Sequence, residues 1–242
     1  FAHAPVDRHD YERVRELRGL QFSSSAASCR PHAVVSIGPP AAGKTFVLEN
    51  SALNLLRSRC GAPPMDDFVR LDPDYYLSNA LDNNNDHREM ANFLNHESFM
   101  CAVGQRRHLL FDHTGKDLVN TCGRIVARLR EANYVVHLVI VVSEYASCCR
   151  RKDQRLESTG RPVCDSYAQT CFKALRTNIP WYLENNKSVA DTTTLYPNNF
   201  RSSPTARVIE TDSDVRSAVE FAQARLKLQT SSKMPPSAPS GR

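Results

Sequence analysis

The sequence lacks any hydrophobic run long enough to cross a membrane. Its longest apolar segment, Tyr134 to Val142, falls far short of the roughly 20 apolar residues that a membrane-spanning helix requires. That segment is better interpreted as a buried strand. The chain begins with Phe1 rather than Met, which predicts either a fragment or a protein that has lost a leader.

The eight cysteines and eight histidines show none of the usual metal-binding or redox spacings. No two cysteines form a C-x-x-C pair, and no histidines stand at zinc-ligand spacing from them. Cys101 and Cys171 fall on predicted helix faces, where a free thiol behaves as a small apolar side chain. We therefore expect no structural metal, no disulfide framework and a reducing intracellular compartment, either the cytoplasm or the mitochondrial matrix.

Strong charge is also absent. The net charge is +5 and the isoelectric point is about 8.8, below the clustered basicity of a dedicated nucleic-acid binder. This excess suits a phosphate-rich ligand, and it equally describes a solvated surface slightly rich in arginine. A chain of 242 residues can form one α/β domain with short extensions.

Short apolar runs alternate with helical patterns along the chain. The predicted strands are residues 33–37, 68–71, 108–111, 134–142 and 207–210. The predicted helices are residues 44–56, 90–101, 121–132, 144–157, 165–179 and 212–226. Pro180 is expected to end the fifth helix and Asp212 to cap the last. The alternation indicates an α/β fold with a doubly wound, mainly parallel sheet and helices on both faces.

Residues 38–45, G-P-P-A-A-G-K-T, match the phosphate-binding pattern G-x-x-x-x-G-K-[ST] between a predicted strand and a predicted helix. Backbone N–H groups of such a loop face the β-phosphate, where the helix dipole also favours negative charge. Lys44 is expected to reach the β- and γ-phosphates of ATP, and the Thr45 hydroxyl to bind Mg²⁺. The residues predicted to bind nucleotide are Gly38, Ala41, Ala42, Gly43, Lys44 and Thr45.

Two other classes of phosphate-loop protein lack support. The guanine-reading pattern N-K-x-D of GTPases is missing, since Asn186-Lys187 is followed by Ser188-Val189. The long hydrophobic strand ending in Asp-Glu that large motor ATPases carry is missing too. A small kinase-like P-loop NTPase remains.

A kinase that phosphorylates a hydroxyl group needs a carboxylate to accept or orient its proton. Such groups belong at the carboxyl ends of the strands. After the second predicted strand, Asp74 is our first candidate for this base and Asp72 the second, while a solvated turn is the alternative. After the third, Asp112 can bind Mg²⁺ through a water molecule, contact the acceptor hydroxyl with help from Thr114, or merely cap the strand end.

Arginines that follow the fourth strand form a candidate lid at about residues 144–165. A helical hairpin with arginine on both arms can close over ATP and neutralise the charge on the transferring phosphoryl group. Any one of these arginines, taken alone, also fits an ordinary surface side chain. The candidates are Arg150, Arg151, Arg155 and, as the strongest individual, Arg161.

These motifs together resemble the zeta-toxin family of P-loop kinases, within the wider group that includes polynucleotide kinases and small-molecule phosphotransferases. The resemblance covers roughly residues 33–185. It depends on the phosphate loop, Asp72-x-Asp74-x-aromatic, Asp112-x-Thr114-Gly115-Lys116, Thr159-Gly160-Arg161 and the segment Lys173 to Asn178.

The resemblance implies ATP and Mg²⁺ binding by Lys44 and Thr45, acceptor activation by Asp74, and phosphate contacts from Arg155 and Arg161. The first lid cation falls on either Gln154 or Arg155. Bacterial members of the family phosphorylate a UDP-linked amino sugar, which makes a sugar nucleotide the first acceptor to test.

We expect three segments: an N-terminal extension at 1–32, the P-loop kinase-like domain at 33–228, and a disordered or partner-bound tail at 229–242. The extensions suggest an alternative to the enzyme, a nucleotide-binding or degenerate P-loop subunit with a structural role in a larger complex, such as a ribonucleoprotein. A polynucleotide 5′-hydroxyl kinase is a third interpretation, so the acceptor can be a small molecule or a nucleic acid.

Overall fold

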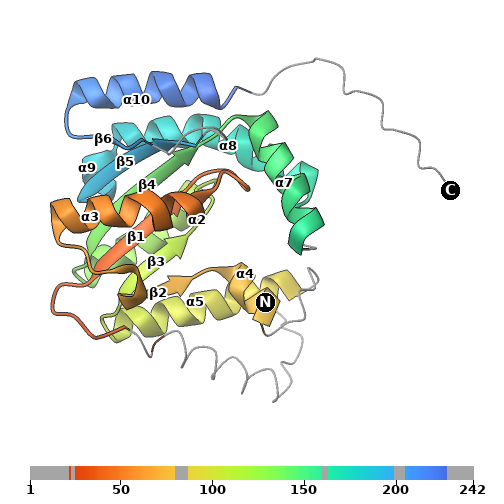
Figure 1. Ribbon diagram of the computed structural model, residues 1–242. Coiled ribbons are helices and arrows are strands. Elements are labelled where there is room, and N and C mark those ends of the chain that lie inside the picture. Colours follow the sequence, from red (N-terminus) through yellow and green to blue (C-terminus); the bar gives the residue numbers. More distant parts are fainter. Residues whose placement is uncertain (1–21, 23–24, 80–86, 160–162, 199–204, 228–242) are drawn as a thin grey trace.

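The computed structural model describes residues 22, 25–79, 87–159, 163–198 and 205–227 (Figure 1). Most of the predicted N-terminal extension, Arg161 and the tail at 229–242 lie outside these residues. None of the described helices combines the length and the apolar composition needed to cross a membrane.

A sheet with the strand order β2-β3-β1-β4-β5-β6 forms the centre of the described chain. The strands are β1 (His32–Ile37), β2 (Phe68–Leu71), β3 (His108–Asp112), β4 (Val135–Val142), β5 (Thr192–Pro197) and β6 (Arg207–Val208). Every neighbouring pair is parallel except β5 and β6, which run antiparallel. The predicted α/β fold with a mainly parallel sheet is confirmed.

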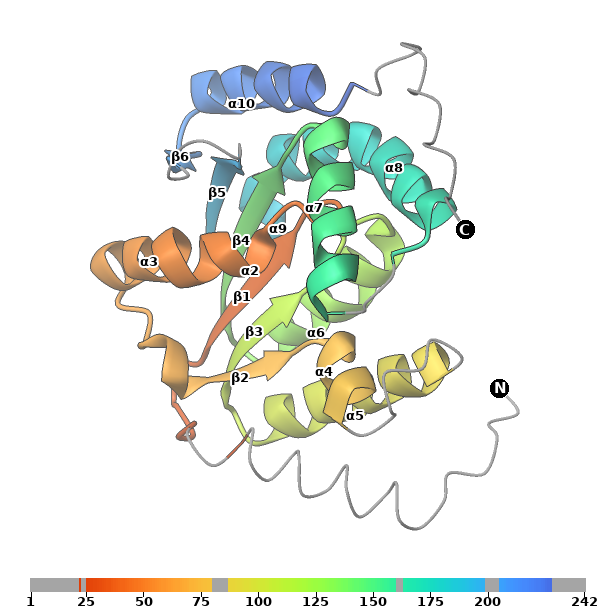
Figure 2. The same cartoon turned by 45° about the vertical axis from the view of Figure 1, so that its right-hand side comes forward.

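Central strands of a parallel sheet are covered on both faces, so they need apolar side chains at nearly every position. β1 is buried along its whole length, and so is β4 after its first residue. Helices α2 and α3 lie over one face of these strands, whereas α6 and α8 lie over the other (Figures 1 and 2). α10 packs against α8. The carboxyl ends of the parallel strands are left open as the place for a site.

The helices follow the strands in the order expected of βαβ units. They are α2 (Lys44–Val47), α3 (Leu53–Cys60), α4 (Pro73–Asn79), α5 (Arg88–Gly104), α6 (Ala127–Glu131), α7 (Tyr145–Thr159), α8 (Asp165–Glu184), α9 (Asn186–Val189) and α10 (Asp212–Arg225). A π-helical stretch, Leu48–Ala52, joins α2 to α3, and a second, Val119–Val126, leads into α6.

The sheet differs from the prediction at its far edge. β5, with the sequence T-T-T-L-Y-P, was not predicted, because three consecutive threonines lack the apolar pattern of a buried strand. It is nevertheless buried, and the β-branched threonines suit its pleated backbone. The last predicted strand, 207–210, is shortened to Arg207–Val208.

Two predictions about helix ends were wrong. α8 does not end before Pro180 but continues through it to Glu184. A proline within a helix costs about 3 kcal/mol, and here burial of Ile179, Tyr182 and Leu183 on the same helix offsets that cost. α10 is capped by Thr211, not Asp212, since the Thr211 side chain and Asp214 form a reciprocal capping box.

Three histidines lie side by side at the amino end of the sheet, on the neighbouring strands β3, β1 and β4. His32 Nδ1 lies 2.9 Å from His137 Nε2, with the two rings stacked, and the His32 backbone N–H donates to His108 Nδ1. His137 Nδ1 also lies 2.8 Å from the Thr192 hydroxyl. Burial and the neighbouring His32 lower the pKa of His137 to about 4, so this histidine is held neutral.

This arrangement predicts acid sensitivity. The unfolded chain takes up a proton on His137 near pH 6.5 and the folded chain near pH 4, so stability is full above pH 6.5 and is lost as the pH falls through this window. The loss from His137 alone is about 3 kcal/mol at most. Urea unfolding at pH 5 to 7.5 measures it. His137→Asn makes the pH dependence shallower, whereas His96→Asn at an exposed position leaves it unchanged. A His137→Asn profile parallel to wild type would contradict this.

Candidate functional site

The phosphate-binding loop connects β1 to α2 and requires glycine at both ends. A Cβ on Gly38 would lie 2.3 Å from the Val141 carbonyl oxygen of β4. A Cβ on Gly43 would lie 2.2 Å from Asn198 Nδ2, and Gly43 has a positive φ of 81°. Ala41 also adopts the left-handed region, with a φ of 58°. The loop is therefore tightly seated on the ends of β4 and β5.

Lys44, the first residue of α2, folds back over this loop. Its Nζ donates to the carbonyl oxygens of Gly38 (3.2 Å) and Pro39 (3.4 Å) and lies 3.6 Å from Asp112 Oδ1. Asp112 ends β3 and also accepts a hydrogen bond from Ser36 Oγ at 3.1 Å. The structure therefore brings together Lys44 and Asp112, two residues that the sequence placed in one site.

Thr45 presents its hydroxyl towards the end of β2. Arg70 Nη2 donates to Thr45 Oγ1 at 3.2 Å, and Arg70 Nη1 lies 3.5 Å from Glu49 Oε1. The Thr45 hydroxyl therefore faces the open end of the sheet beside a cation that sequence analysis did not include. The face of the sheet to which the Arg70 side chain points depends on the register of β2, and a single sequence does not give that register.

Asp72 and Asp74 follow β2 as predicted, but they start a helix instead of forming a solvated turn. Pro73 is the first residue of α4, a position where its missing N–H costs nothing. Asp72 Oδ1 accepts from the backbone N–H of Asp74 at 2.9 Å, as an N-cap residue does. The helix therefore fixes the positions of both carboxylates.

Asp74 is held between two arginines from different elements. Arg88 Nη1, at the start of α5, lies 2.6 Å from Asp74 Oδ1, and Arg155 Nη2, on α7, lies 2.8 Å from Asp74 Oδ2. Burial alone would raise the pKa of Asp74, but the hydrogen bonds and charges of Arg88 and Arg155 outweigh it and lower that pKa. Asp74 is therefore ionised at neutral pH.

Asp72 has the opposite electrostatic environment. Burial, followed by the negative charges of Asp112 and Asp74, raises its pKa to about 6. Three carboxylates therefore converge at the ends of β2 and β3, and their mutual repulsion favours a bound cation or proton.

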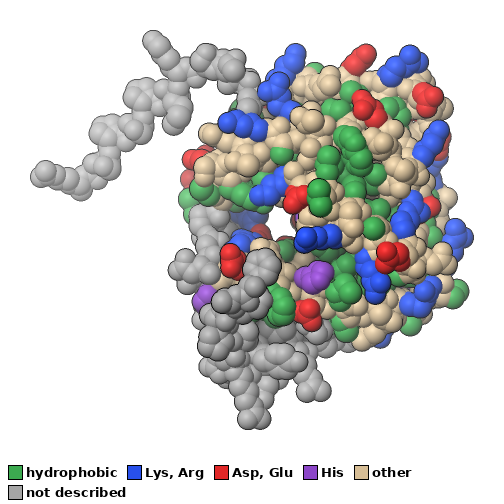
Figure 3. Space-filling model, turned by 180° about the vertical axis from the view of Figure 1, so that it is seen from behind, with side chains coloured by type: hydrophobic (Ala, Val, Ile, Leu, Met, Phe, Trp, Pro, Cys, Tyr) green, Lys and Arg blue, Asp and Glu red, His purple; other side chains and the backbone are tan. Residues whose placement is uncertain are grey.

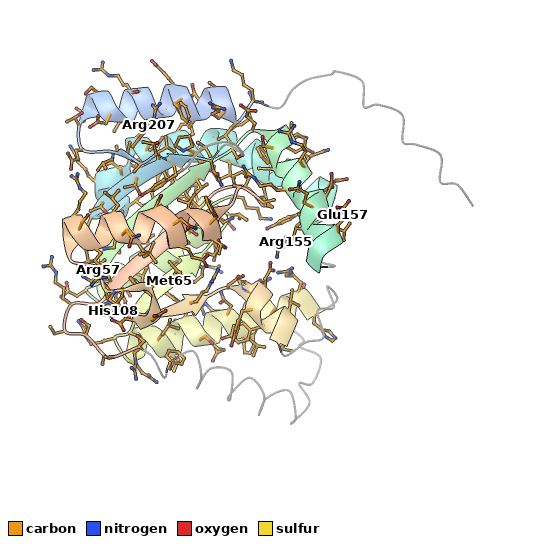
Figure 4. All side chains as sticks on the ribbon, in the orientation of Figure 1. Arg57, Met65, His108, Arg155, Glu157 and Arg207 are labelled. Atoms are coloured by element: carbon orange, nitrogen blue, oxygen red, sulfur yellow. The ribbon has the colours of Figure 1, made fainter. Side chains whose placement is uncertain are left out.

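The lid helix α7 contributes its arginines to different tasks. Arg155 points from α7 towards α4, whereas Gln154 is exposed, so Arg155 is the residue that faces the site (Figure 4). Arg151 donates to the Ala41 carbonyl oxygen of the phosphate loop, and Arg150 donates to Ser147 Oγ. Seen from behind, the molecule has an opening with basic and acidic side chains near its rim (Figure 3). Arg161 lies outside the described residues.

A side chain of α8, Asn178, holds the turn that follows β3. Asn178 Nδ2 donates to the carbonyl oxygens of Gly115 (3.1 Å) and Lys116 (2.8 Å). His113 packs locally, with its Nδ1 accepting from the Gly115 N–H at 3.0 Å, and burial lowers its pKa to about 4. His113 therefore has a local role in holding this turn.

Sequence reasoning missed Arg88, Arg70 and Asn198 as members of this site. Arg88 follows a polar segment and starts α5. It is distant in sequence from the other motifs, so it was not assigned to the site. Asn198 directly follows the unpredicted β5, at the carboxyl end of a strand where site residues belong. Recognising β5 would therefore have indicated Asn198.

The donor set fits a magnesium ion. Among the described residues, no group of three His, Cys, Asp or Glu side chains has a metal-holding arrangement. Mg²⁺ in phosphate-transfer sites keeps several waters and takes only one or two protein ligands together with phosphate oxygens. The Thr45 hydroxyl and the mutually repelling carboxylates of Asp72 and Asp112 provide oxygen donors of that kind.

The raised pKa of Asp72 gives a prediction about stability. Its folded pKa of about 6 exceeds the ordinary 3.8, so ionised Asp72 destabilises the folded protein increasingly as the pH rises from 4 to 6. Asp72→Asn keeps the oxygen that caps α4 and removes the charge. We expect a gain of about 3 kcal/mol at most at pH 8 that vanishes near pH 4. Chemical denaturation at both values measures it, and a loss of stability at pH 8 would refute the assignment.

Comparison with solved structures supports the fold. A chain from the PezAT chromosomal toxin–antitoxin system of Streptococcus pneumoniae aligns with a TM-score of 0.65 and 13% identity, covering 94% of this chain and 90% of its own. A structure of AvrRxo1-ORF1:-ORF2 with ATP aligns with a TM-score of 0.67 and 13% identity, covering 92% and 74%. Similarity at this level of identity shows a shared fold.

No curated protein matches the sequence significantly. A protein-family model does: the model described as Zeta toxin matches residues 18–201, a range that extends on both sides beyond the motifs at 33–185. Because this match covers most of the 242 residues, the chain belongs to the zeta toxin family.

Proposed function

We propose that this protein is an ATP-dependent kinase that transfers the γ-phosphate to a hydroxyl group of its acceptor. The observation that carries the proposal is the meeting of a phosphate-binding loop with strand-end carboxylates, seen in the 3.6 Å approach of Lys44 Nζ to Asp112 Oδ1. Membership of the zeta toxin family supports a phosphotransferase. A relative of the same fold crystallised with ATP supports the nucleotide.

ATP would bind along the loop at 38–45. Backbone N–H groups at the start of α2 face its phosphates, and Lys44 neutralises the β- and γ-phosphate charge. Thr45 and the carboxylates of Asp112 and Asp72 would hold Mg²⁺, which supplies charge neutralisation on the phosphate oxygens. The Thr45 hydroxyl group, which accepts a hydrogen bond from Arg70 in this structure, would be one of the oxygen donors to the ion.

Asp74 is the proposed base. In the transfer, the acceptor oxygen forms a bond to Pγ, the bond from Pγ to the bridging oxygen of ADP breaks, and the hydroxyl proton passes to the Asp74 carboxylate. Arg88 and Arg155 hold the Asp74 carboxylate in place, and a carboxylate can accept several hydrogen bonds at once. Arg155, with Arg161 from the lid, then stabilises negative charge on the transferring group.

The acceptor is a small molecule, with a sugar nucleotide as the first choice because of the zeta-toxin resemblance, or the 5′ end of a nucleic acid. The solved relative from a toxin–antitoxin system indicates that a protein partner is a further candidate. A partner or a ribonucleoprotein would contact the extensions at 1–32 and 229–242.

The alternative, a P-loop subunit with an assembly role, differs from a kinase in one measurable property, the transfer of phosphate. A structural subunit can retain the fold and the loop without transferring phosphate. The network of Lys44, Asp112 and Asp74 favours the enzyme, because an ionised Asp74 held by two arginines has no evident use in a scaffold.

Calorimetric titration with ATP and Mg²⁺, followed by a γ-phosphate transfer assay, tests the proposal. Wild type binds ATP with micromolar affinity, and Lys44→Ala weakens binding at least tenfold. Asp74→Asn retains ATP binding but lowers transfer to sugar nucleotides or RNA 5′ ends by about 10² to 10⁴. Asp66→Asn, at an exposed position before β2, is the matched control and keeps full activity. Absence of ATP binding by the wild type would favour the assembly role.

A further inference from the structure

Side chains from two distant elements bind the back of the phosphate-binding loop. Asn198 Nδ2, after β5, donates to the Ala42 carbonyl oxygen at 2.7 Å. Arg151 Nη1, on the lid helix α7, donates to the Ala41 carbonyl oxygen at 2.9 Å. Ala42 is fully buried, so its carbonyl group would be costly to leave without a donor. These two donors therefore fix the direction of both carbonyl groups.

Asn198 is itself firmly held. Its backbone N–H continues the β4–β5 ladder by donating to the Val142 carbonyl oxygen at 2.9 Å. Its own carbonyl oxygen accepts from Ser143 Oγ at 3.0 Å and from Arg151 Nη2 at 2.9 Å. With a residue exposure of 6%, Asn198 has little freedom to move. Arg151 thus bridges the loop and the strand end with one planar guanidinium group.

The direction of the Ala42 carbonyl group determines where the next N–H group points. The described chain contains no cis peptide bond, and in a trans peptide the C=O and N–H groups point in opposite directions. With the Ala42 oxygen turned back to Asn198, the Gly43 N–H faces the front of the loop, where an anion binds. A reversed peptide would place a carbonyl oxygen against the phosphate instead.

We propose that Asn198 is a positioning residue for the nucleotide phosphates, which acts through the Ala42–Gly43 peptide, and that Arg151 couples this loop to the lid helix. This inference rests on the proposed function and adds residues that set its phosphate affinity. Sequence analysis grouped Arg151 with the cations that face the phosphoryl group. Its two bonds to carbonyl oxygens give it the linking role, while Arg155 faces Asp74.

Asn198→Asp is the informative variant, because it has the same shape but replaces the donor with an acceptor. At pH 8 a carboxylate would repel the Ala42 carbonyl oxygen, and the affinity for ATP and ADP falls about tenfold or more. A protonated carboxyl group can donate as Asn198 does. The loss relative to wild type therefore shrinks at pH 5.5, a recovery that a general loss of structure would not show.

The matched control is Asn186→Asp. Asn186 is also buried, and its Nδ2 donates to the Leu183 carbonyl oxygen at 2.7 Å, but it lies on α9 away from the loop. This variant loses stability without a pH-dependent change in ATP affinity. Arg151→Lys provides an independent arm, since a single amine keeps the charge but cannot bridge two carbonyl oxygens as a guanidinium does. It raises the KM for ATP about tenfold and leaves the KM for the acceptor unchanged.

A folded Asn198→Asp variant that binds ATP within twofold of wild type at pH 8 would overturn the inference while leaving the kinase proposal intact. If that variant fails to fold, Arg151→Lys decides, and an unchanged KM for ATP overturns the inference. Wild-type protein that does not bind ATP would refute both proposals together.

Discussion

The position of the phosphate-binding loop depends on a contact that leaves no room for a side chain. The backbone of Gly38 runs so close to the end of β4 that a Cβ would lie 2.3 Å from the Val141 carbonyl oxygen. This approach seats the loop on the central strands, and the central strands are in turn fixed by burial on both faces. The position of the loop determines where the Lys44 and Thr45 side chains point. The site is therefore firmly fixed where phosphate would bind.

Electrostatic balance is the second organising feature. Asp72, Asp74 and Asp112 converge at the ends of two neighbouring strands, yet their environments differ. Arginines on both sides keep Asp74 ionised, while burial and the charges of Asp112 and Asp74 outweigh the charge of Arg70 and raise the pKa of Asp72 to about 6. Pairs of carboxylates whose environments push their pKa values apart are typical of sites that divide proton and metal chemistry between them. The proposed roles of base for Asp74 and magnesium ligand for Asp72 follow this division.

The sequence predicted the elements whose patterns are local. The run at 134–142 and the loop at 38–45 contain their own signals, and both lie where expected. β5 was missed because its threonines are buried by neighbours that no local pattern reveals, and Asn198 was missed with it. Pro180 was predicted to end the helix because of its local propensity, but burial of α8 in the folded protein overrides that propensity. Which side chains meet Asp74 depends on chain segments far apart in sequence, and one sequence does not give such pairings.

The buried hydroxyl group of Tyr76 on α4 forms a hydrogen bond with the Ser98 hydroxyl group on α5. Its neighbours form a small apolar cluster of their own, separate from the main core: Leu77, Ala91, Leu94 and the partly buried Met90. α4 and the first turns of α5 are therefore stabilised largely by each other. Segments with few contacts to the main core open at a lower free energy than the domain unfolds. Asp74 and Arg88 belong to this unit, so both are expected to open at a lower free energy than the phosphate-binding loop, which is seated on the central strands.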